Sequence, residues 1–387
     1  MKRAMRKKFE YEDVHQFVDE LFGDDEHAKR VASLAGAVSG VLASGSLAIS
    51  AIGLGLAHLR GLATKHAQKQ VDRLMGNAKL NVWDYFQSWV PYLIGPRKEI
   101  MVAMDWSDFD RDNQTTIALN LLTGHGRAIP MIWKTVDKSQ LKNHRNEYED
   151  EVLERLYQTV PEGVKVTVIA DRGFMDTTLF KALGEVWGFD YIIRMRGNIT
   201  VTNQQGEKRT AAQWVGPNGR ARTLRQAKVT AKEVGVDTVV CVKAKDMKES
   251  WCLASSLAEA KASELTKYYG KRWGIECYFR DAKDAHFGLG LEQVRTKSTE
   301  RRDRIFLLCA LTVVLLTLLG AACEQVGYDR YLKANTVKRR THSLFRQGQM
   351  VYELLPRMDE QWLTKIIAAF SEQIRAHKVL NEVFCVI

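Results

Sequence analysis

The chain has 387 residues, of which 45% are apolar, and its 57 Lys and Arg against 46 Asp and Glu give a formal net charge of +11. This length exceeds what one simple core can bury, so we expect two or three domains in a chain that is folded throughout. The excess of positive charge favours an anionic partner such as nucleic acid. Six cysteines without a C-x2-C pair argue against a zinc knuckle and a disulfide framework, and they indicate reduced thiols in a cytoplasmic protein.

The first 95 residues are expected to form a helical unit. Apolar periodicity predicts helices over residues 11–21, 28–42, 47–62, 65–75 and 80–93. Basic residues stand among these short helices at Arg60, Lys65, Lys69 and Arg73. This arrangement suits a DNA-binding unit of the helix-turn-helix type, in which the sequence alone names no recognition helix. A helical cap on the following domain is the alternative.

A change of pattern at Gly95 and Pro96 opens the next region. Alternating or continuous apolar runs predict strands over 99–105, 115–122, 128–134, 164–170 and 191–195, with helices over 147–160 and 177–187. Three strands, a helix, a buried strand, a helix and a strand form the order of an RNase H-like α/β fold. Asp105 and Asp171 then stand at the carboxyl ends of neighbouring strands, where α/β sheets place their sites.

Residues from about 197 to 250 are basic and lack helical periodicity. Three segments, 198–205, 220–231 and 237–244, are expected to be strands of an inserted β unit, after which a strand over 251–255 returns to the core. The insertion and its approach carry Arg194, Arg196, Lys208, Arg209, Arg220, Arg222, Arg225 and Lys228. One sign of charge over such a region favours a surface that follows a phosphate backbone, and a surface hairpin without function is the alternative.

The segment YYGKRWGIECYFRDAK, residues 268–283, is predicted to be one helix at the edge of a core. At about 100° per residue, one polar stripe would present Tyr269, Arg272, Glu276 and Lys283. An adjoining apolar stripe would hold Tyr268, Ile275, Phe279 and Ala282 against the protein. The alternative is a solvated charged face in which Arg272 and Glu276 pair incidentally.

Two features follow this segment. The run over 305–323 is apolar on every side and long enough to cross a bilayer, so it predicts either the central helix of a large core, which we favour, or a membrane span. The region 326–387 is expected to be helical, with a basic tract and an amphipathic final helix whose apolar side packs on the core or forms a dimer surface. The basic tract comprises Lys333, Lys338, Arg339, Arg340 and Arg346.

These residues together resemble the bacterial insertion-sequence transposases of the DDE class. The helical segment carries their Y-x2-R-x3-E-x6-K signature, and AMDWSD around Asp105 and IADRGF around Asp171 are similar to their first two acidic motifs. The resemblance covers roughly residues 99–325, and the β insertion is typical of the hairpin-forming, cut-and-paste branch. It implies a helical DNA-binding domain (1–95), an RNase H-like catalytic core with the β insertion (96–325) and a helical C-terminal region (326–387).

The resemblance also implies how the acidic residues act. Asp105, Asp171 and Glu276 would hold two divalent cations, with Asp105 shared between them. Hard cations choose carboxylate oxygens, so Mg²⁺ is expected, with Mn²⁺ as the alternative. No cluster of cysteines or histidines offers a zinc site.

Other residues of the resemblance would handle DNA. Arg272 and Tyr269 would grip a phosphate near the scissile bond, and Lys283 would reach another phosphate of the same strand. Arg172 would contact phosphate or serve as a structural partner of Asp171. Trp251 would stack on a base flipped from the element end, against the alternative of a core tryptophan.

The resulting hypothesis is a cut-and-paste DNA transposase that acts in the bacterial cytoplasm, at the nucleoid, as a homodimer on two element ends and a target DNA. No membrane partner is expected. One alternative is an RNase H-like nuclease that cleaves without joining. Others are a membrane or scaffold protein built on the 305–323 run, and a decayed copy that only binds DNA.

Overall fold

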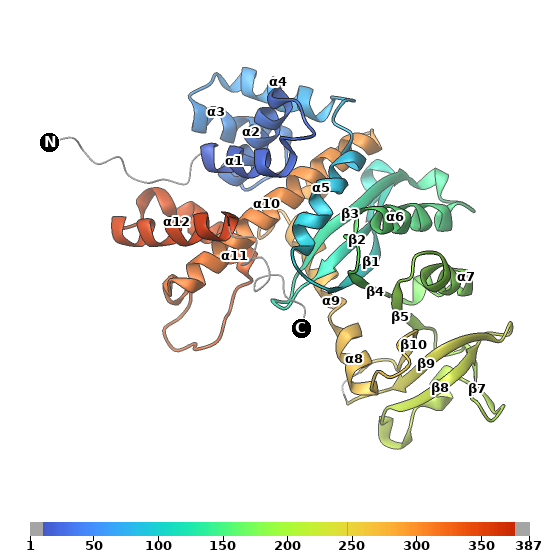
Figure 1. Cartoon of the computed structure of the whole chain (residues 1–387). Helices are drawn as coiled ribbons and strands as arrows, with labels where there is room; N and C mark the ends of the chain where they lie inside the picture. The colour runs from blue at the N-terminus through green and yellow to red at the C-terminus, as the bar shows by residue number, and fades with distance from the viewer. Residues whose placement is uncertain (1–10, 246, 376–387) are drawn as a thin grey trace.

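The structure is a computed structural model that describes residues 11–245 and 247–375. It is a mixed α/β protein in which ten strands form one mixed sheet. Figure 1 shows the N-terminal helices stacked on a long central helix, with the sheet to one side and the basic insertion at the far end of that sheet. The mixed α/β class predicted from the sequence is confirmed.

The N-terminal region, residues 11–94, is helical as predicted. Its helices are α1 (Tyr11–Phe22), α2 (Ala28–Ser44), α3 (Ile49–Arg60), α4 (Thr64–Met75) and α5 (Val82–Ile94). Their apolar faces share one core with the rest of the chain, and the Trp89 indole of α5 donates a hydrogen bond to the Pro130 carbonyl at 2.9 Å. The helical unit is therefore attached to the sheet by buried contacts.

The first half of the sheet follows the predicted strand order. It consists of β1 (Glu99–Phe109), β2 (Gln114–Leu122), β3 (Ala128–Asp137), β4 (Lys165–Ala170) and β5 (Asp190–Met195). In space the order is β3-β2-β1-β4-β5, and the β1–β4 and β4–β5 pairs are parallel. The connections carry α6 (Arg145–Thr159) and α7 (Thr177–Lys181), which continues as a π-helical turn (Ala182–Val186). Strand β2 lies in the interior and is buried at every residue, which explains its continuous apolar and small polar sequence.

The basic insertion differs from the expected separate β unit. Its strands are β6 (Thr200–Thr202), β7 (Lys208–Thr210), β8 (Arg222–Val229), β9 (Val234–Val242) and the returning β10 (Trp251–Ser255). Strand β10 pairs with β5 on one side and β9 on the other, so the sheet continues as β5-β10-β9-β8-β6-β7. The backbone hydrogen bonds of β10 thus join the insertion to the first half of the sheet.

The predicted helix over residues 268–283 is divided in the structure. Helix α8 (Ala262–Gly270) ends two residues before α9 (Trp273–Lys283) begins. The remaining helices are α10 (Thr299–Gln325), α11 (Leu344–Leu354) and α12 (Glu360–Arg375). Single 3-10 turns lie at η1 (Asp110–Asp112), η2 (Lys138–Gln140), η3 (Arg172–Phe174), η5 (Ala211–Trp214), η6 (Pro217–Gly219), η7 (Leu291–Gln293), η8 (Tyr328–Leu332) and η9 (Leu355–Arg357).

Helix α10 is the central helix of the core. By length and composition it could cross a membrane, and 94% of its most apolar window is buried inside the protein. Helix α11 crosses it at very close range, because a Cβ on Gly348 would stand 1.9 Å from the Leu316 carbonyl oxygen. The apolar stripe of α12 is also buried and packs against α10. Both the long apolar run and the final amphipathic helix thus pack in the core, as the commoner interpretation of each pattern predicted.

The first turns of α10 connect three parts of the chain. Arg301 pairs with Asp72 of α4 at 2.5 Å, and Arg304 donates to the carbonyls of Met75 at 3.0 Å and Leu80 at 2.7 Å. Arg302 is fully buried and forms an ion pair with Asp112, in the turn after β1. The arginines before the apolar run therefore attach the helical unit and the end of β1 to one helix.

Candidate active site

Asp105 and Asp171 are neighbours in the register of the sheet. Strands β1 and β4 run parallel, and their last paired residues are Met104 and Ala170. The two aspartates follow immediately, at the point where β4 ends. Strand β1 does not end there as predicted, but continues to Phe109 paired with β2 alone. Asp105 thus lies within a strand at the edge left by its shorter neighbour.

Local contacts hold both carboxylates. The backbone N–H of Trp106 donates to Asp105 Oδ1 at 2.9 Å, and that of Gly173 donates to Asp171 Oδ1 at 2.7 Å. A Cβ at residue 173 would stand only 2.9 Å from the same Asp171 oxygen, so the glycine of IADRGF leaves room for this contact. The Trp106 indole also donates to Glu149 of α6 at 2.8 Å, which attaches the strand beside Asp105 to the helix behind it.

The break between α8 and α9 changes the predicted polar stripe. From Tyr268 to Ile275 the backbone bonds join residues three apart, as in the N–H of Arg272 to the Tyr269 carbonyl at 3.0 Å. This tighter winding rotates each residue by about 120° instead of 100°. Tyr269 is only 4% exposed and packs against Trp251, whereas Arg272 pairs with Asp105 and Glu276. The four signature residues do not form one continuous stripe.

Arg272 lies between two of the three predicted acidic residues. Its Nη1 donates to Asp105 Oδ2 at 3.0 Å and its Nη2 donates to Glu276 Oε1 at 2.5 Å. The Arg272 side chain is only 15% exposed, so these are shielded, charge-assisted contacts. The intrahelical pairing of Arg272 with Glu276 that the sequence suggested is present, and a long-range pairing with Asp105 accompanies it.

Asp105 has an electrostatically unusual carboxyl. Burial raises its pKa to about 6, and Arg272 opposes this effect. Asp171 and Glu276 raise the pKa further because their negative charges repel that of Asp105. The structure therefore brings Asp171 and Glu276 close enough to Asp105 for their charges to interact with it.

Tyr269 and Trp251 form an aromatic pair beside the acidic residues. Their ring centroids are 4.9 Å apart at an interplanar angle of 76°, an edge-to-face contact. Trp251 is partly buried against the core, and Tyr269 lies close to Arg194, Arg272 and Asp171. Burial raises the pKa of the Tyr269 phenol. Strand β10 thus places Trp251 next to the acidic residues through Tyr269.

Arg172 does not pair with Asp171, which was one of the two roles considered for it. Its Nη1 contacts Glu249 at 3.0 Å, and Arg194 contacts the same carboxylate at 2.9 Å. These three side chains line a cavity of about 610 Å³ together with Arg196 and Lys243. Sequence reasoning missed Glu249, although a carboxylate two residues before Trp251 in a basic segment was a detectable signal.

Lys283 is attached to the end of β1. Its Nζ donates to the Asp108 carbonyl at 2.5 Å, lies 3.4 Å from a Glu292 oxygen and stands 4.2 Å from the Phe109 ring centroid. Burial lowers the pKa of the ammonium. In this arrangement Lys283 supports the strand that carries Asp105.

The acidic residues have the donor chemistry for a divalent cation. Carboxylate oxygens are the ligands that Mg²⁺ prefers, and repulsion at Asp105 is what a bound cation would relieve. In the described part of the chain, no three acidic, histidine or cysteine side chains are close enough to enclose a metal ion. Arg272 instead supplies the positive charge between Asp105 and Glu276. Asp105, Asp171 and Glu276 would supply the oxygen ligands of a cation, and in this structure Arg272 pairs with two of them.

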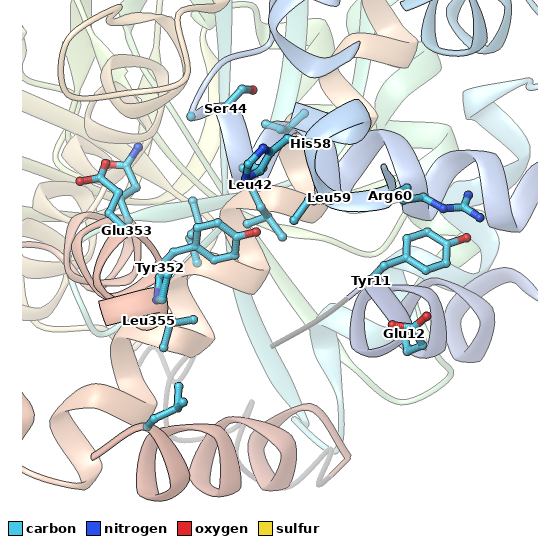
Figure 2. Close-up of a pocket in the computed structure, with 17 residues that line it drawn as sticks. Tyr11, Glu12, Leu42, Ser44, His58, Leu59, Arg60, Tyr352, Glu353 and Leu355 are labelled. Carbon is cyan, nitrogen blue, oxygen red and sulfur yellow. The ribbon is translucent and has the colours of Figure 1, made fainter. Parts of the chain in front are cut away.

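A second cavity, of about 870 Å³, is lined by residues of the N-terminal and C-terminal helices. Figure 2 shows Tyr11 and Arg60 on one side of it and Tyr352 and Leu355 on the other. The guanidinium of Arg60 stands 4.7 Å from the centroid of the Tyr11 ring. Among the described residues that line it, none belongs to the predicted site. This cavity separates the N-terminal from the C-terminal helices.

Comparison with known protein families gives a match to a transposase family. Residues 114–313 match the sequence model of a family described as the transposase DDE domain, which spans just over half of the chain. The matched segment includes Asp171 and Glu276, and Asp105 lies shortly before its first residue. A search of curated proteins gives no match.

Proposed function

Because the chain belongs to the family of the transposase DDE domain, we propose that it is a cut-and-paste DNA transposase. In this proposal it binds the ends of its element, nicks and excises them through a DNA hairpin, and joins the 3′-hydroxyl ends to target DNA. The observation that carries the proposal is the convergence of Asp105, Asp171 and Glu276 around Arg272. The strand order β3-β2-β1-β4-β5 is compatible with an RNase H-like core.

The three carboxylates would hold two divalent cations, Mg²⁺ or Mn²⁺. Two such ions neutralise charge on the attacking and leaving oxygens of a phosphodiester. Asp105, next to Asp171 in the sheet and to Arg272, occupies the central position that a shared ligand requires. Arg272, once it leaves the carboxylates, would bind a phosphate oxygen of the scissile strand with the same guanidinium.

The aromatic pair would serve the hairpin step. A hairpin requires one strand to bend sharply, and a base must leave the stack, which costs a few kcal/mol. Trp251 would offset this cost by stacking on the flipped base, with its orientation held by Tyr269. Arg172 and Arg194 line the cavity of about 610 Å³ and would bind the phosphates beside that base.

The remaining partners are also proposals. The net positive charge of the protein favours DNA as its partner, both as element end and as target. A homodimer would hold the two element ends together. We place the protein in the bacterial cytoplasm at the nucleoid, without a membrane partner. The burial of α10 in the core supports only the part of this proposal that α10 does not span a membrane.

The substitution Glu276→Gln tests the proposed chemistry. Purified protein is incubated with a duplex that carries the DNA flanking its own coding sequence and with Mg²⁺, and nicked, hairpin and strand-transfer products are separated on a denaturing gel. The variant should lose all three products by about 10³-fold or more while it retains duplex binding, because the amide keeps the shape but not the charge of the ligand. Metal-dependent cleavage by Glu276→Gln at the wild-type rate would falsify the assignment. Cleavage by wild-type protein without hairpin or strand-transfer products would reduce the function to that of a nuclease.

A further inference from the structure

Helices α3 and α4 form a compact helix-turn-helix. They are joined by three residues, Gly61, Leu62 and Ala63, and such short turns with glycine are typical of this motif. Gly61 has a φ of +62°, a left-handed conformation that glycine adopts without strain, and the Leu62 N–H bonds back to the Ala57 carbonyl at 3.0 Å. The turn therefore fixes the direction in which α4 leaves α3.

One face of α4 is buried and the opposite face is cationic. The helix buries Ala67, Val71, Leu74 and Met75 against its neighbours. Its exposed face carries Thr64, Lys65, His66, Lys69 and Arg73. Because Lys65, Lys69 and Arg73 are four residues apart, they form one stripe along the helix.

The acidic residue of α4 is already neutralised. Asp72 pairs with Arg301 of α10 at 2.5 Å, so it does not reduce the charge of the stripe. Within the part of the chain that the structure describes, no carboxylate forms an ion pair with Lys65, Lys69 or Arg73. Their charges are therefore available to an external anion.

A groove runs beside this stripe, between α2 and α4. It has a volume of about 460 Å³ and is lined by Lys29, Arg30 and Ser33 of α2 and by His66, Gln70, Arg73, Leu74 and Asn77. The described lining contains cations and neutral groups but no carboxylate. A cationic groove alongside an exposed helix complements duplex DNA, in which a phosphate backbone borders the major groove.

We propose that α4 is the recognition helix of this protein and enters the major groove of duplex DNA. The N-terminal half of a recognition helix contacts base edges, so Lys65 and Lys69 would donate to guanine O6 and N7. Lys29 and Arg73 would bind the adjacent phosphate backbone. This assignment rests on the proposed function, and it names the element that selects the DNA on which that function acts.

Two double variants separate base reading from phosphate binding. Wild-type protein first selects preferred sequences from a library of random duplexes, without divalent ions so that nothing is cleaved. The affinity for the preferred duplex is then compared with that for a random duplex as salt is varied. Lys65→Ala/Lys69→Ala should lower the ratio of the two affinities on the order of 10- to 100-fold. Lys29→Ala/Arg73→Ala should weaken both affinities by similar factors and reduce the salt slope by about 2.

Arg357→Ala/Lys365→Ala provides the matched control. Both side chains are exposed, and the change removes the same charge from the C-terminal region, so the ratio of affinities should stay at the wild-type value. An unchanged ratio in Lys65→Ala/Lys69→Ala would overturn the proposal, as would a wild-type protein that cleaves DNA with Mg²⁺ but selects no sequence. Failure of the proposed function is recognised separately, because wild-type protein would then produce no Mg²⁺-dependent nicks, hairpins or strand-transfer products.

Discussion

Asp303 makes stability depend on pH. This residue of α10 is half-buried, and its carboxylate accepts a hydrogen bond from the backbone N–H of Thr135 in β3 at 2.9 Å. Burial raises its pKa to about 7 from an ordinary value of 3.8. Between about pH 4 and pH 7, the Asp303 carboxyl is therefore protonated in the folded state and ionised in the unfolded chain. The contribution of Asp303 to the free energy of unfolding is complete below about pH 4 and is lost as the pH rises through about 7.

The size of this effect follows from the two pKa values. Each unit of pKa difference corresponds to about 1.4 kcal/mol, so ionisation of Asp303 costs roughly 4 kcal/mol over the whole range. Between pH 5 and pH 8 the loss amounts to about 2–3 kcal/mol. Asp303→Asn keeps an oxygen that can accept from Thr135 and carries no charge at either pH. Its free energy of unfolding relative to wild type should therefore increase by at most about 3 kcal/mol between pH 5 and pH 8.

Urea unfolding of both proteins at pH 5 and pH 8 measures this difference. Asp237→Asn is the control, because it makes the same chemical change at a residue of β9 that is exposed. If the difference between Asp303→Asn and wild type were equal at pH 5 and pH 8, the pKa of Asp303 would not be raised in the folded protein. A difference that grows toward low pH would reverse the sign of the reasoning.

Two further substitutions test other parts of the structure. Trp251→Ala should slow hairpin formation by roughly 5- to 150-fold, the equivalent of about 1–3 kcal/mol of stacking, and should slow the first nick much less. Nicked and hairpin products quantified over time measure both rates, and Trp251→Phe should restore part of the lost hairpin formation. Equal losses at both steps would count against stacking. Gly348→Ala should lower the free energy of unfolding by about 1–3 kcal/mol, because its Cβ would stand 1.9 Å from the Leu316 carbonyl. Gly235→Ala, whose Cβ would meet nothing within 4 Å, should stay close to wild type in the same urea titration, and an equal loss in both variants would contradict the close helix crossing.

Local periodicity predicted most elements of the fold. The helices of the first 94 residues and the strands β2, β4, β5 and β10 lie within a few residues of their expected bounds. The predicted end of β1 was wrong because its last residues, from Trp106 to Phe109, are held in the strand by pairing with β2. A local sequence pattern does not show which strand lies alongside. Strand β7 was missed because it has three residues and little burial.

The sequence named candidate site residues, which stay a prediction, but it did not predict their geometry. Motif spacing identified Asp105, Asp171 and Glu276, and the order of elements brought the two aspartates together in the sheet. The break between α8 and α9 was missed because its tighter backbone winding has no signature in a helical wheel. The contact of Arg272 with Asp105 joins residues 167 positions apart, a distance that only the tertiary fold closes.

The first turns of α10 also have a consequence for where the proposed activity would cut DNA. Through Arg301 and Arg304 they hold the C-terminal end of α4, and through Arg302 they hold the turn that follows the strand of Asp105. If α4 reads DNA and Asp105 takes part in cutting it, as proposed, these contacts would fix the number of base pairs between the sequence that is read and the bond that is broken. Loosening Arg304 would then blur the position of the cut, leaving a ladder of products in place of a single band.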